Sequence, residues 1–244
     1  MSISYWLLAV ILLMVPSAWA NNPAKPIAEH AKPPTPTCRT DTWARLSFYH
    51  DANAVSVAAL RPQVVFMGDS ITQGWQSQPF IQSNPQFVGR GIGGQTAPQM
   101  LVRFHADVIA LKPRLVHIMA GANDVAENTG VETDEEIEGY IASMAVLARA
   151  NGIRVVLASI LPALDYPWQT GLHPVPRIKR LNAWIRDYAA RNSLVYVDYW
   201  PAMATPEGGM KPELSEDGVH PNASGYAAMQ PLASAAIERA LGDQ

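Results

Sequence analysis

Four short motifs in this sequence hold residue types that could together carry out acyl transfer on a serine. In chain order they are Gly68-Asp69-Ser70, Gly91-Ile92-Gly93-Gly94, Gly121-Ala122-Asn123-Asp124 and Asp217-Gly218-Val219-His220. They supply a hydroxyl nucleophile, backbone and side-chain donors for a developing negative charge, and a histidine with a nearby carboxylate. Each motif is short enough to have another explanation, so the hypothesis requires a fold that brings all of them together.

Ser70 is the candidate nucleophile, and His220 is its candidate base. A serine hydroxyl is a weak nucleophile that needs a base within hydrogen-bonding reach. Asp217 precedes His220 by three residues, so its carboxylate can hold Nδ1 of the imidazole and leave Nε2 free to take the serine proton. The alternative interpretation is that Asp69 or Ser70 only caps a short helix and that His220 lies on a surface turn.

The two middle motifs offer hydrogen-bond donors for an oxyanion. The N–H group of Ser70 itself and those of the glycine run 91–94 can face a developing negative charge, although glycine-rich turns are common for other reasons. Asn123 adds a side-chain amide, and losing one such donor typically costs about 3 kcal/mol of transition-state stabilisation. Asp124 is expected to brace its loop rather than to react.

The other histidines are weaker candidates for the base, because none has an acidic partner at a comparable spacing. They are His30, His50, His105, His117 and His173. His117 lies in a predicted strand and is interpreted as a hydrogen-bonded core residue. A substrate contact is a minor possibility for His173, which belongs to a proline-rich loop.

Short apolar runs separated by amphipathic segments predict how the motifs are positioned. The predicted buried strands are 64–67, 87–88, 115–119, 155–158 and 194–197, and the predicted helices are 96–109, 134–151, 178–192 and 226–241. This alternation predicts a parallel sheet with helices on both faces. Ligands bind beyond the carboxyl ends of the strands in such sheets. Three of the motifs follow predicted strands, and the fourth precedes the last helix.

The chain divides into three predicted parts. Residues 1–20 contain an apolar run and end in Ala18-Trp19-Ala20, which is typical of a cleaved signal peptide. Residues 21–40 contain five prolines and few large apolar residues, as in a linker. Residues 41–244 are predicted to form the single domain. Cys38 is the only cysteine, so an intramolecular disulfide is excluded.

Taken in this order and spacing, the four motifs resemble those of the SGNH hydrolases, also called GDSL esterases and lipases, over about residues 64–241. The resemblance implies an α/β fold, a three-layer α/β/α sandwich with a five-stranded parallel sheet, flavodoxin-like. It also implies that no metal or organic cofactor is used.

The resemblance further implies a role for each site residue. It makes Ser70 the nucleophile, with Asp217 and His220 as its triad partners. The family's second motif reads Asn-x-Gly-x-x-Gly, so the last glycine, Gly94, is selected over Gly93. The implied oxyanion hole consists of the Ser70 N–H, the Gly94 N–H and the Asn123 side chain. One position departs from the pattern, since Gly89 stands where the family has asparagine, and we expect this to affect loop bracing rather than catalysis.

These features predict an exported serine esterase, periplasmic or secreted, that forms an acyl-enzyme on Ser70. The expected substrate is a small-molecule, glycan or lipid ester. The absence of a long apolar lid favours short-chain or acetyl esters, while lysophospholipids and thioesters stay open. A formal net charge of −3 gives no reason to expect a nucleic-acid partner, and no stable membrane insertion is expected after signal cleavage.

Two rival functions are consistent with parts of the pattern. The first is a metal-dependent phosphoesterase using Asp69, Asn123, Asp124 and His220, although such dinuclear sites need more ligands than these loops offer. The second is a non-catalytic envelope protein that binds acylated glycans. The loop 166–168, the loop 172–176 and the two aromatic residues Trp75 and Phe80 could line the substrate pocket or simply pack.

Overall fold

The computed structural model describes residues 43–56 and 62–242. The predicted signal peptide 1–20, the predicted linker 21–40 and Cys38 lie outside the described residues, so the division of the chain into three parts stays a prediction. None of the helices in the described ranges is long and apolar enough to cross a membrane.

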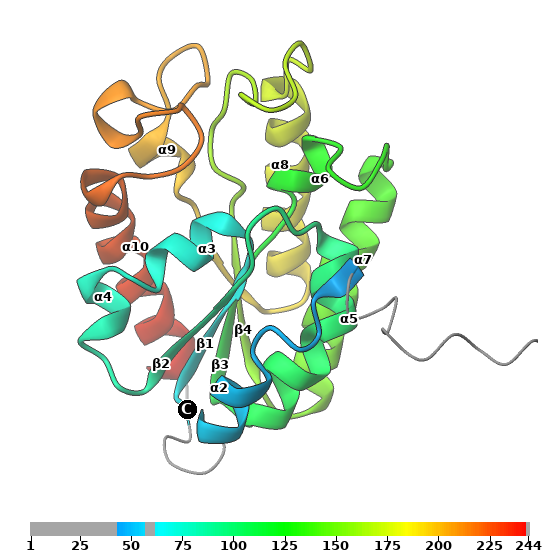
Figure 1. The fold of residues 1–244 in the computed structure, drawn as a ribbon, viewed down its shortest axis with the longest axis vertical. Helices are drawn as coiled ribbons and strands as arrows, with labels where there is room; N and C mark the ends of the chain where they lie inside the picture. Colours follow the sequence, from blue (N-terminus) through cyan, green and yellow to red (C-terminus); the bar gives the residue numbers. More distant parts are fainter. Residues whose placement is uncertain (1–42, 57–61, 243–244) are drawn as a thin grey trace, which may run out of the picture. The chain divides into compact units, whose positions relative to one another are not determined.

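A single parallel sheet of five strands organises the described residues (Figure 1), in the order β2-β1-β3-β4-β5. The strands are β1 (Val64–Gly68), β2 (Phe87–Gly91), β3 (Leu115–Met119), β4 (Arg154–Ala158) and β5 (Val195–Val197). This order is the flavodoxin-like arrangement, so the predicted fold class is confirmed.

Helices cover both faces of the sheet. One face packs against α5 (Ala97–Asp107), α7 (Asp134–Ala150) and α8 (Val175–Arg191). The other face packs against α3 (Ser70–Trp75), α4 (Pro79–Gln82), α9 (Trp200–Met203) and α10 (Ala223–Gly242). Shorter elements are α2 (His50–Val55), α6 (Ala122–Val125) and the 3-10 turns η2 (Ile109–Leu111) and η3 (Pro212–Leu214).

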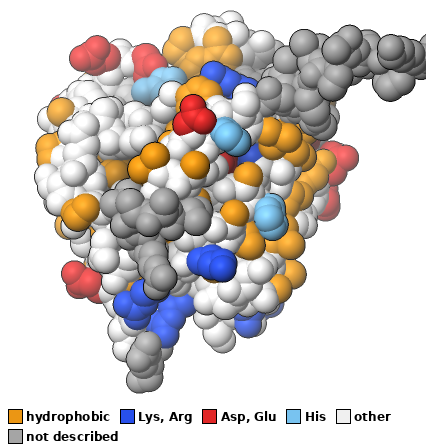
Figure 2. Space-filling model, turned by 60° about the horizontal axis from the view of Figure 1, so that its bottom comes forward, with side chains coloured by type: hydrophobic (Ala, Val, Ile, Leu, Met, Phe, Trp, Pro, Cys, Tyr) orange, Lys and Arg blue, Asp and Glu red, His pale blue; other side chains and the backbone are white. Residues whose placement is uncertain are grey.

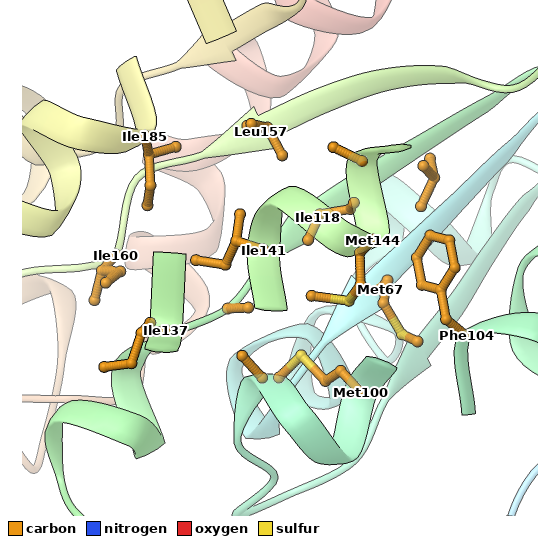
Figure 3. Packing of buried hydrophobic residues seen from close by; sticks show 14 of the residues in the cluster. Met67, Met100, Phe104, Ile118, Ile137, Ile141, Met144, Leu157, Ile160 and Ile185 are labelled. Carbon is orange, nitrogen blue, oxygen red and sulfur yellow. The ribbon is translucent and has the colours of Figure 1, made fainter. Parts of the chain in front are cut away.

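The alternation of side chains along each strand builds two separate cores. Successive residues of a strand point to opposite faces, so Val65 and Met67 of β1 join the core under α5, α7 and α8, whereas Val64 and Phe66 join the core under α3 and α10. Figure 3 shows the first core, where Met67 lies among side chains from β3, α5 and α7. Because both faces are buried, most strand residues are apolar, which is why short apolar runs predicted the strands, although β2 contains Arg90 and β3 contains His117.

Caps at both ends fix where α7 begins and ends. At the start of α7, the Glu136 N–H donates to Thr133 Oγ1 at 3.2 Å, and Glu136 Oε2 accepts from the Thr133 N–H at 2.7 Å. The helix ends at Asn151 and Gly152, and Gly152 adopts a φ of +71°. The predicted end of this helix is therefore confirmed.

β2 is longer than the sequence predicts. The apolar run stops at Val88, but pairing with β1 continues through Gly89 and Arg90 to Gly91, which lies opposite Gly68. The glycine run thus begins inside the sheet rather than after it. Apolar content could not reveal this half of the strand, because it consists of two glycines and an arginine, although all three residues are buried.

Candidate active site

The turn between β1 and α3 presents Ser70 at the carboxyl edge of the sheet. Gly68 permits the close approach, since a Cβ there would lie 2.1 Å from Thr72 Oγ1 and 2.9 Å from the Met119 carbonyl oxygen. Asp69 is the N-cap of α3, and its Oδ1 accepts from the Ile71 N–H at 2.9 Å. The cap and the exposed serine hydroxyl are thus two consequences of one turn.

The fold brings Ser70, His220 and Asp217 into a hydrogen-bonded series. Ser70 Oγ lies 2.9 Å from His220 Nε2, across 150 residues of chain. His220 Nδ1 lies 2.6 Å from Asp217 Oδ2. The other carboxylate oxygen of Asp217 accepts from the backbone N–H groups of Val219 at 2.9 Å and His220 at 2.8 Å. This loop therefore holds the carboxylate, and the carboxylate holds the imidazole.

The Asp217 carboxyl is ionised at neutral pH. Partial burial alone would raise its pKa, but the hydrogen bonds that it accepts from the His220 side chain and from the His220 and Val219 backbones outweigh burial and lower the pKa to about 2. A carboxylate beside Nδ1 favours the tautomer with the proton on that nitrogen, which leaves Nε2 as the acceptor that faces Ser70.

Only one of the two neighbouring glycine N–H groups is available to a ligand. The Gly93 N–H donates to Gln73 Oε1 at 2.7 Å. Within the described residues no acceptor is found for the Gly94 N–H, and Gly94 is exposed with a φ of +77°, which a glycine adopts without strain. The preference for Gly94 over Gly93 thus has a physical basis.

The Asn123 side chain lies at the floor of the same pocket, 3% exposed. Its Nδ2 donates to the Gln95 carbonyl oxygen at 3.0 Å and makes a longer contact of 3.4 Å with Asp69 Oδ2. Its Oδ1 accepts from Asn128 Nδ2 at 2.8 Å. The amide is therefore held at both ends, with its donor nitrogen on the side of the nucleophile turn.

A pocket of about 280 Å³ joins these groups. Its lining consists of Ser70, Gly94, Asn123, Asn128, Trp168 and His220. Ser70, Gly94, Asn123 and His220 were all predicted from the sequence, and Asp217 stands directly behind His220. The pocket has room for a small acyl group next to the Ser70 hydroxyl.

Several residues with an ambiguous interpretation belong to the core instead. Trp75 and Phe80 are 0% and 8% exposed and stack on each other with their centroids 5.5 Å apart. Asp124 is also buried, and its carboxylate accepts from the Ala97 N–H at 2.9 Å, which ties the loop after β3 to the start of α5 as expected. His173 is not among the residues that line the pocket.

His117 is buried, but it is only half hydrogen-bonded. Its Nε2 lies 2.9 Å from the Tyr199 hydroxyl, while its Nδ1 has no partner among the described residues. Burial lowers the pKa of His117 to about 4, so the ring is neutral in the core. The interpretation of His117 as a hydrogen-bonded core residue is thus confirmed, with the hydrogen bond at one of its two ring nitrogens.

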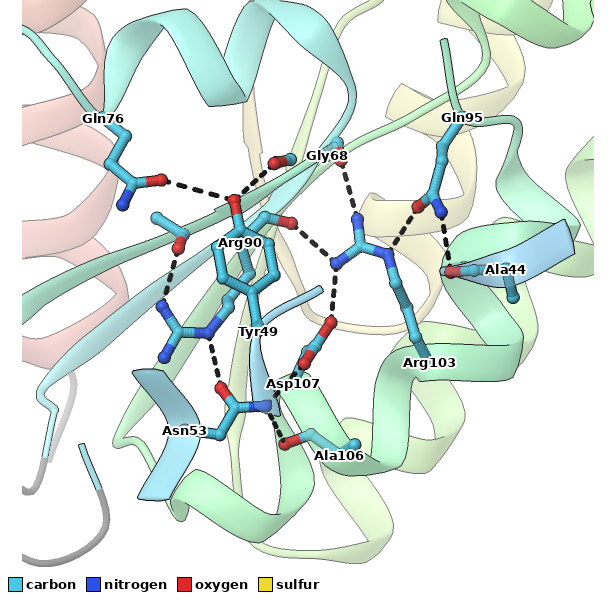
Figure 4. A network of polar contacts seen from close by, with 12 residues as sticks. Ala44, Tyr49, Asn53, Gly68, Gln76, Arg90, Gln95, Arg103, Ala106 and Asp107 are labelled. Carbon is cyan, nitrogen blue, oxygen red and sulfur yellow. Dashed lines mark hydrogen bonds and ion pairs between the residues drawn. The ribbon is translucent and has the colours of Figure 1, made fainter. Parts of the chain in front are cut away.

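A buried arginine supports the loops of the pocket from below (Figure 4). Arg103 of α5 is 0% exposed and donates to the carbonyl oxygens of Gly68 and Arg90, at 2.9 and 2.8 Å, and to Gln95 Oε1 at 2.5 Å. It also pairs with Asp107 at 2.9 Å. Arg103 therefore connects the last residue of β1, the end of β2 and the loop that carries Gly94.

The N-terminal segment of the described domain completes this network. The Tyr49 hydroxyl donates to the Gly91 carbonyl oxygen at 2.5 Å, and Asn53 Oδ1 accepts from Arg90 Nε at 2.7 Å. Asn53 Nδ2 donates to Asp107 Oδ1 at 2.7 Å. These contacts fasten α2 to the strand that leads into the glycine run (Figure 4).

Two residues of the site region were missed by sequence reasoning. Asn128 lies in a polar turn whose composition is typical of any surface loop, so its contact with Asn123 has no local signal. Arg103 did have a weak signal, because Asp107 follows it by four residues, the spacing of a helical ion pair. That spacing did not reveal burial of the pair.

The fold is that of a known family of hydrolases. A model of the GDSL-like Lipase/Acylhydrolase family matches residues 66–228, and the chain belongs to this family. The resemblance to the SGNH hydrolases is thereby confirmed, and the chain is a carboxylic ester hydrolase.

Three relatives align with 81%, 80% and 55% of the chain. A crystal structure of a GDSL-like lipase from Bacteroides thetaiotaomicron is 43% identical with a TM-score of 0.77, covering 81% of this chain and 99% of that one. Platelet-activating factor acetylhydrolase IB subunit alpha1 of Bos taurus is 26% identical over 80% of this chain and 84% of its own length. Esterase TesA of Pseudomonas aeruginosa is 30% identical over 55% of this chain and 60% of its own length.

Proposed function

We propose that the chain hydrolyses esters through an acyl-enzyme on Ser70, with His220 and Asp217 as its triad partners. The observation that carries this proposal is the unbroken series from Ser70 Oγ to His220 Nε2, at 2.9 Å, and from His220 Nδ1 to Asp217 Oδ2, at 2.6 Å. The series ends in a pocket that also holds Gly94 and Asn123.

The proposed reaction has two halves. His220 Nε2 takes the Ser70 proton as Oγ attacks the ester carbonyl, and the N–H groups of Ser70 and Gly94 and the Asn123 amide receive the oxyanion. The tetrahedral intermediate collapses as His220 gives the proton to the leaving alcohol. A water molecule then attacks the acyl-enzyme, His220 takes its proton, and the carboxylic acid leaves as the proton returns to Ser70 Oγ.

The test is removal of the nucleophile. Ser70→Ala is expected to lower kcat for p-nitrophenyl acetate by roughly 10⁴–10⁶-fold and to abolish labelling by a fluorophosphonate. Ser143→Ala, on the exposed side of α7, is the matched control and should keep both. Turnover by Ser70→Ala close to that of the control would contradict the mechanism.

The same assay separates the esterase from its rivals. Among the described residues, no three His, Cys, Asp or Glu side chains gather in a way that could hold a metal ion. Activity that survives EDTA but not the fluorophosphonate supports the serine mechanism, whereas the reverse supports a metal-dependent phosphoesterase. Saturable binding of acylated glycans without turnover of any ester would favour the non-catalytic binder.

For the substrate we propose a short acyl group, such as acetyl. Two observations support this. The pocket of about 280 Å³ is small, and one relative is named as an acetylhydrolase. A series of p-nitrophenyl esters from acetate to decanoate should show kcat/KM falling beyond about four carbons. Acetylated xylan and a lysophospholipid, tested beside it, separate glycan esters from lipid esters.

We also propose that the protein is exported and lies in the periplasm or outside the cell. The signal-like segment at residues 1–20 supports this proposal. A relative that is 25% identical over 60% of the chain is named as a lipoprotein, which is consistent with export. N-terminal sequencing of the mature protein should begin near Asn21. A mature protein that begins at Met1 would contradict cleavage.

A further inference from the structure

A series of hydrogen bonds connects the wall of the pocket to the candidate oxyanion donors. Trp168 Nε1 donates to Asn128 Oδ1 at 2.9 Å. Asn128 Nδ2 donates in turn to Asn123 Oδ1 at 2.8 Å and to the Gly94 carbonyl oxygen at 3.2 Å. Asn128 therefore contacts two of the three residues whose donors are assigned to the oxyanion hole, Asn123 and Gly94.

The indole sets the direction of the whole series. An indole nitrogen can only donate, so it fixes the oxygen of the Asn128 amide on its own side and the nitrogen on the other. That nitrogen in turn requires the oxygen, and not the nitrogen, of the Asn123 amide to face it. The Asn123 nitrogen is left to point toward the Gln95 carbonyl and the nucleophile turn. One donor-only group thus orients two amides in succession.

Trp168 is itself held in place by its turn. The Gln169 N–H donates to the Tyr166 carbonyl oxygen at 3.0 Å, and Pro167 occupies a position where its fixed φ favours a turn. Tyr166 is 1% exposed and anchors the turn in the core, with its ring centroid 5.3 Å from that of Trp168. Trp168 remains 45% exposed, so its ring is a fixed surface open to a ligand.

The Trp168 ring stands next to the group that handles the leaving alcohol. Its centroid lies 5.8 Å from that of the His220 ring, at an interplanar angle of 37°. In the proposed mechanism His220 gives its proton to the leaving alcohol. The alcohol portion of an ester must therefore pass beside this ring, whereas the carbonyl oxygen lies toward Gly94 and Asn123.

We propose that Asn128 is a positioning residue that orients the Asn123 amide and the Gly94 backbone, and that Trp168, which holds Asn128, forms the wall for the leaving alcohol and favours flat or ring-shaped alcohols. The inference rests on the proposed acyl-enzyme mechanism at Ser70. It predicts that two parts of one tryptophan, the N–H group and the ring face, have separable effects.

The amide series is tested at Asn128. Asn128→Asp still accepts from the indole but presents no donor to Asn123 Oδ1, so the Asn123 amide turns away from the oxyanion, and kcat for p-nitrophenyl acetate should fall about 100-fold. Asn128→Ala removes the contact without repulsion and should cost about tenfold, mainly in kcat, with KM and the midpoint of the acid limb of the pH profile unchanged. Asn151→Asp, which adds the same charge at the end of α7, is the control.

The two roles of Trp168 are separated by two variants. Trp168→Phe keeps a ring but loses the N–H group. Its kcat/KM should therefore fall by about the same factor for the ester of every alcohol, as is expected for Asn128→Ala. Trp168→Ala also loses the wall, so acetates of aryl and sugar alcohols should lose about tenfold more than methyl acetate. Trp43, 43% exposed, supplies matched Phe and Ala controls.

Each outcome separates the inference from the proposed function. If Ser70→Ala is inactive while the Asn128 and Trp168 variants match their controls, the inference is overturned and the mechanism stands. If Trp168→Ala loses the same factor with every alcohol, the wall is overturned and the amide series stands. Turnover by Ser70→Ala would overturn both. Asn128 and Trp168 are exposed, so thermal unfolding midpoints within about 3 °C of wild type are expected and are checked for every variant.

Discussion

The nucleophile turn satisfies two interpretations that appeared to compete. Asp69 caps α3, which is the structural interpretation, and the same turn directs Ser70 toward His220, which is the catalytic one. Asp69 is also buried, with 2% of its surface exposed. A carboxyl group in that position is costly to ionise, so the cap has a consequence for stability that depends on pH.

Burial raises the pKa of Asp69 to about 6, partly offset by its hydrogen bond with the Ile71 N–H and by His220. An unfolded aspartate titrates near 4, so the folded state binds the proton more tightly. Asp69 therefore lowers stability as pH rises from about 4, and this cost is complete above about 6. Two pKa units correspond to about 3 kcal/mol.

Asp69→Asn is expected to remove this dependence, because the amide oxygen still accepts from Ile71 and carries no charge. The free energy of unfolding of the variant, relative to wild type, should increase by about 2–3 kcal/mol between pH 4 and pH 8. Urea unfolding at several pH values measures it. Asp51→Asn, on the exposed surface of α2, controls for the loss of one negative charge, and parallel profiles for Asp69→Asn and wild type would contradict the prediction.

At the scale of elements, the loops of the site depend on one side chain of α5. Arg103 serves the ends of β1 and β2 and the Gln95 side chain at once, and its own charge is paired with Asp107. The helix is thereby locked in register with the two strands that precede the nucleophile and the glycine run. No surface interaction could replace this, because every partner is buried.

Arg103→Met is expected to lower the free energy of unfolding by about 3–5 kcal/mol, since it leaves the Asp107 charge and several acceptors buried without their donor. Arg186→Met, which removes an exposed pair on α8, should change stability by no more than about 0.5 kcal/mol. Urea unfolding compares the two. If Arg103→Met lowered the free energy of unfolding as little as Arg186→Met, the buried network would not make the predicted contribution to stability.

Elements with a strong periodic signal could be predicted, and elements defined by distant partners could not. The runs at 64–67 and 115–119 are apolar because both sides of the sheet are covered, so they were found. Helices of one turn, such as α6 around Asn123, are too short to show a period. The contacts of Asn128 could not be predicted from the sequence, because its partners come close to it only in the assembled fold. These partners are Asn123, Gly94 and Trp168.

For the whole molecule, the site exists because one sheet edge collects loops that are far apart in the sequence. Ser70 and His220 are separated by 150 residues of chain, yet the order of the strands and the position of α10 bring their side chains together. Charge contributes little at this scale. On the face shown in Figure 2, Lys and Arg side chains lie in separate groups among uncharged ones. The expectation that the protein has no nucleic-acid partner stays a prediction.

The domain boundary predicted at residue 41 can be tested together with the role of α2. Deleting residues 1–40 removes only the predicted signal peptide and linker, so kcat/KM and the thermal midpoint should stay within error of the mature protein. Deleting residues 1–61 also removes Tyr49, Asn53 and Ser56, which hold the Gly91 carbonyl and the Arg90 guanidinium.

The longer deletion removes two acceptors of the Arg90 guanidinium, the buried Tyr49 ring packed against it and the Asn53 donor to Asp107, at a cost of at least about 3 kcal/mol. For a domain of this size that loss lowers the thermal midpoint by about 6–12 °C. Because Gly91 begins the glycine run that leads to Gly94, kcat should fall as well, even at temperatures where the shortened chain is folded. If both deletions gave the same midpoint and the same kcat, α2 would be a dispensable extension and the domain would begin at β1.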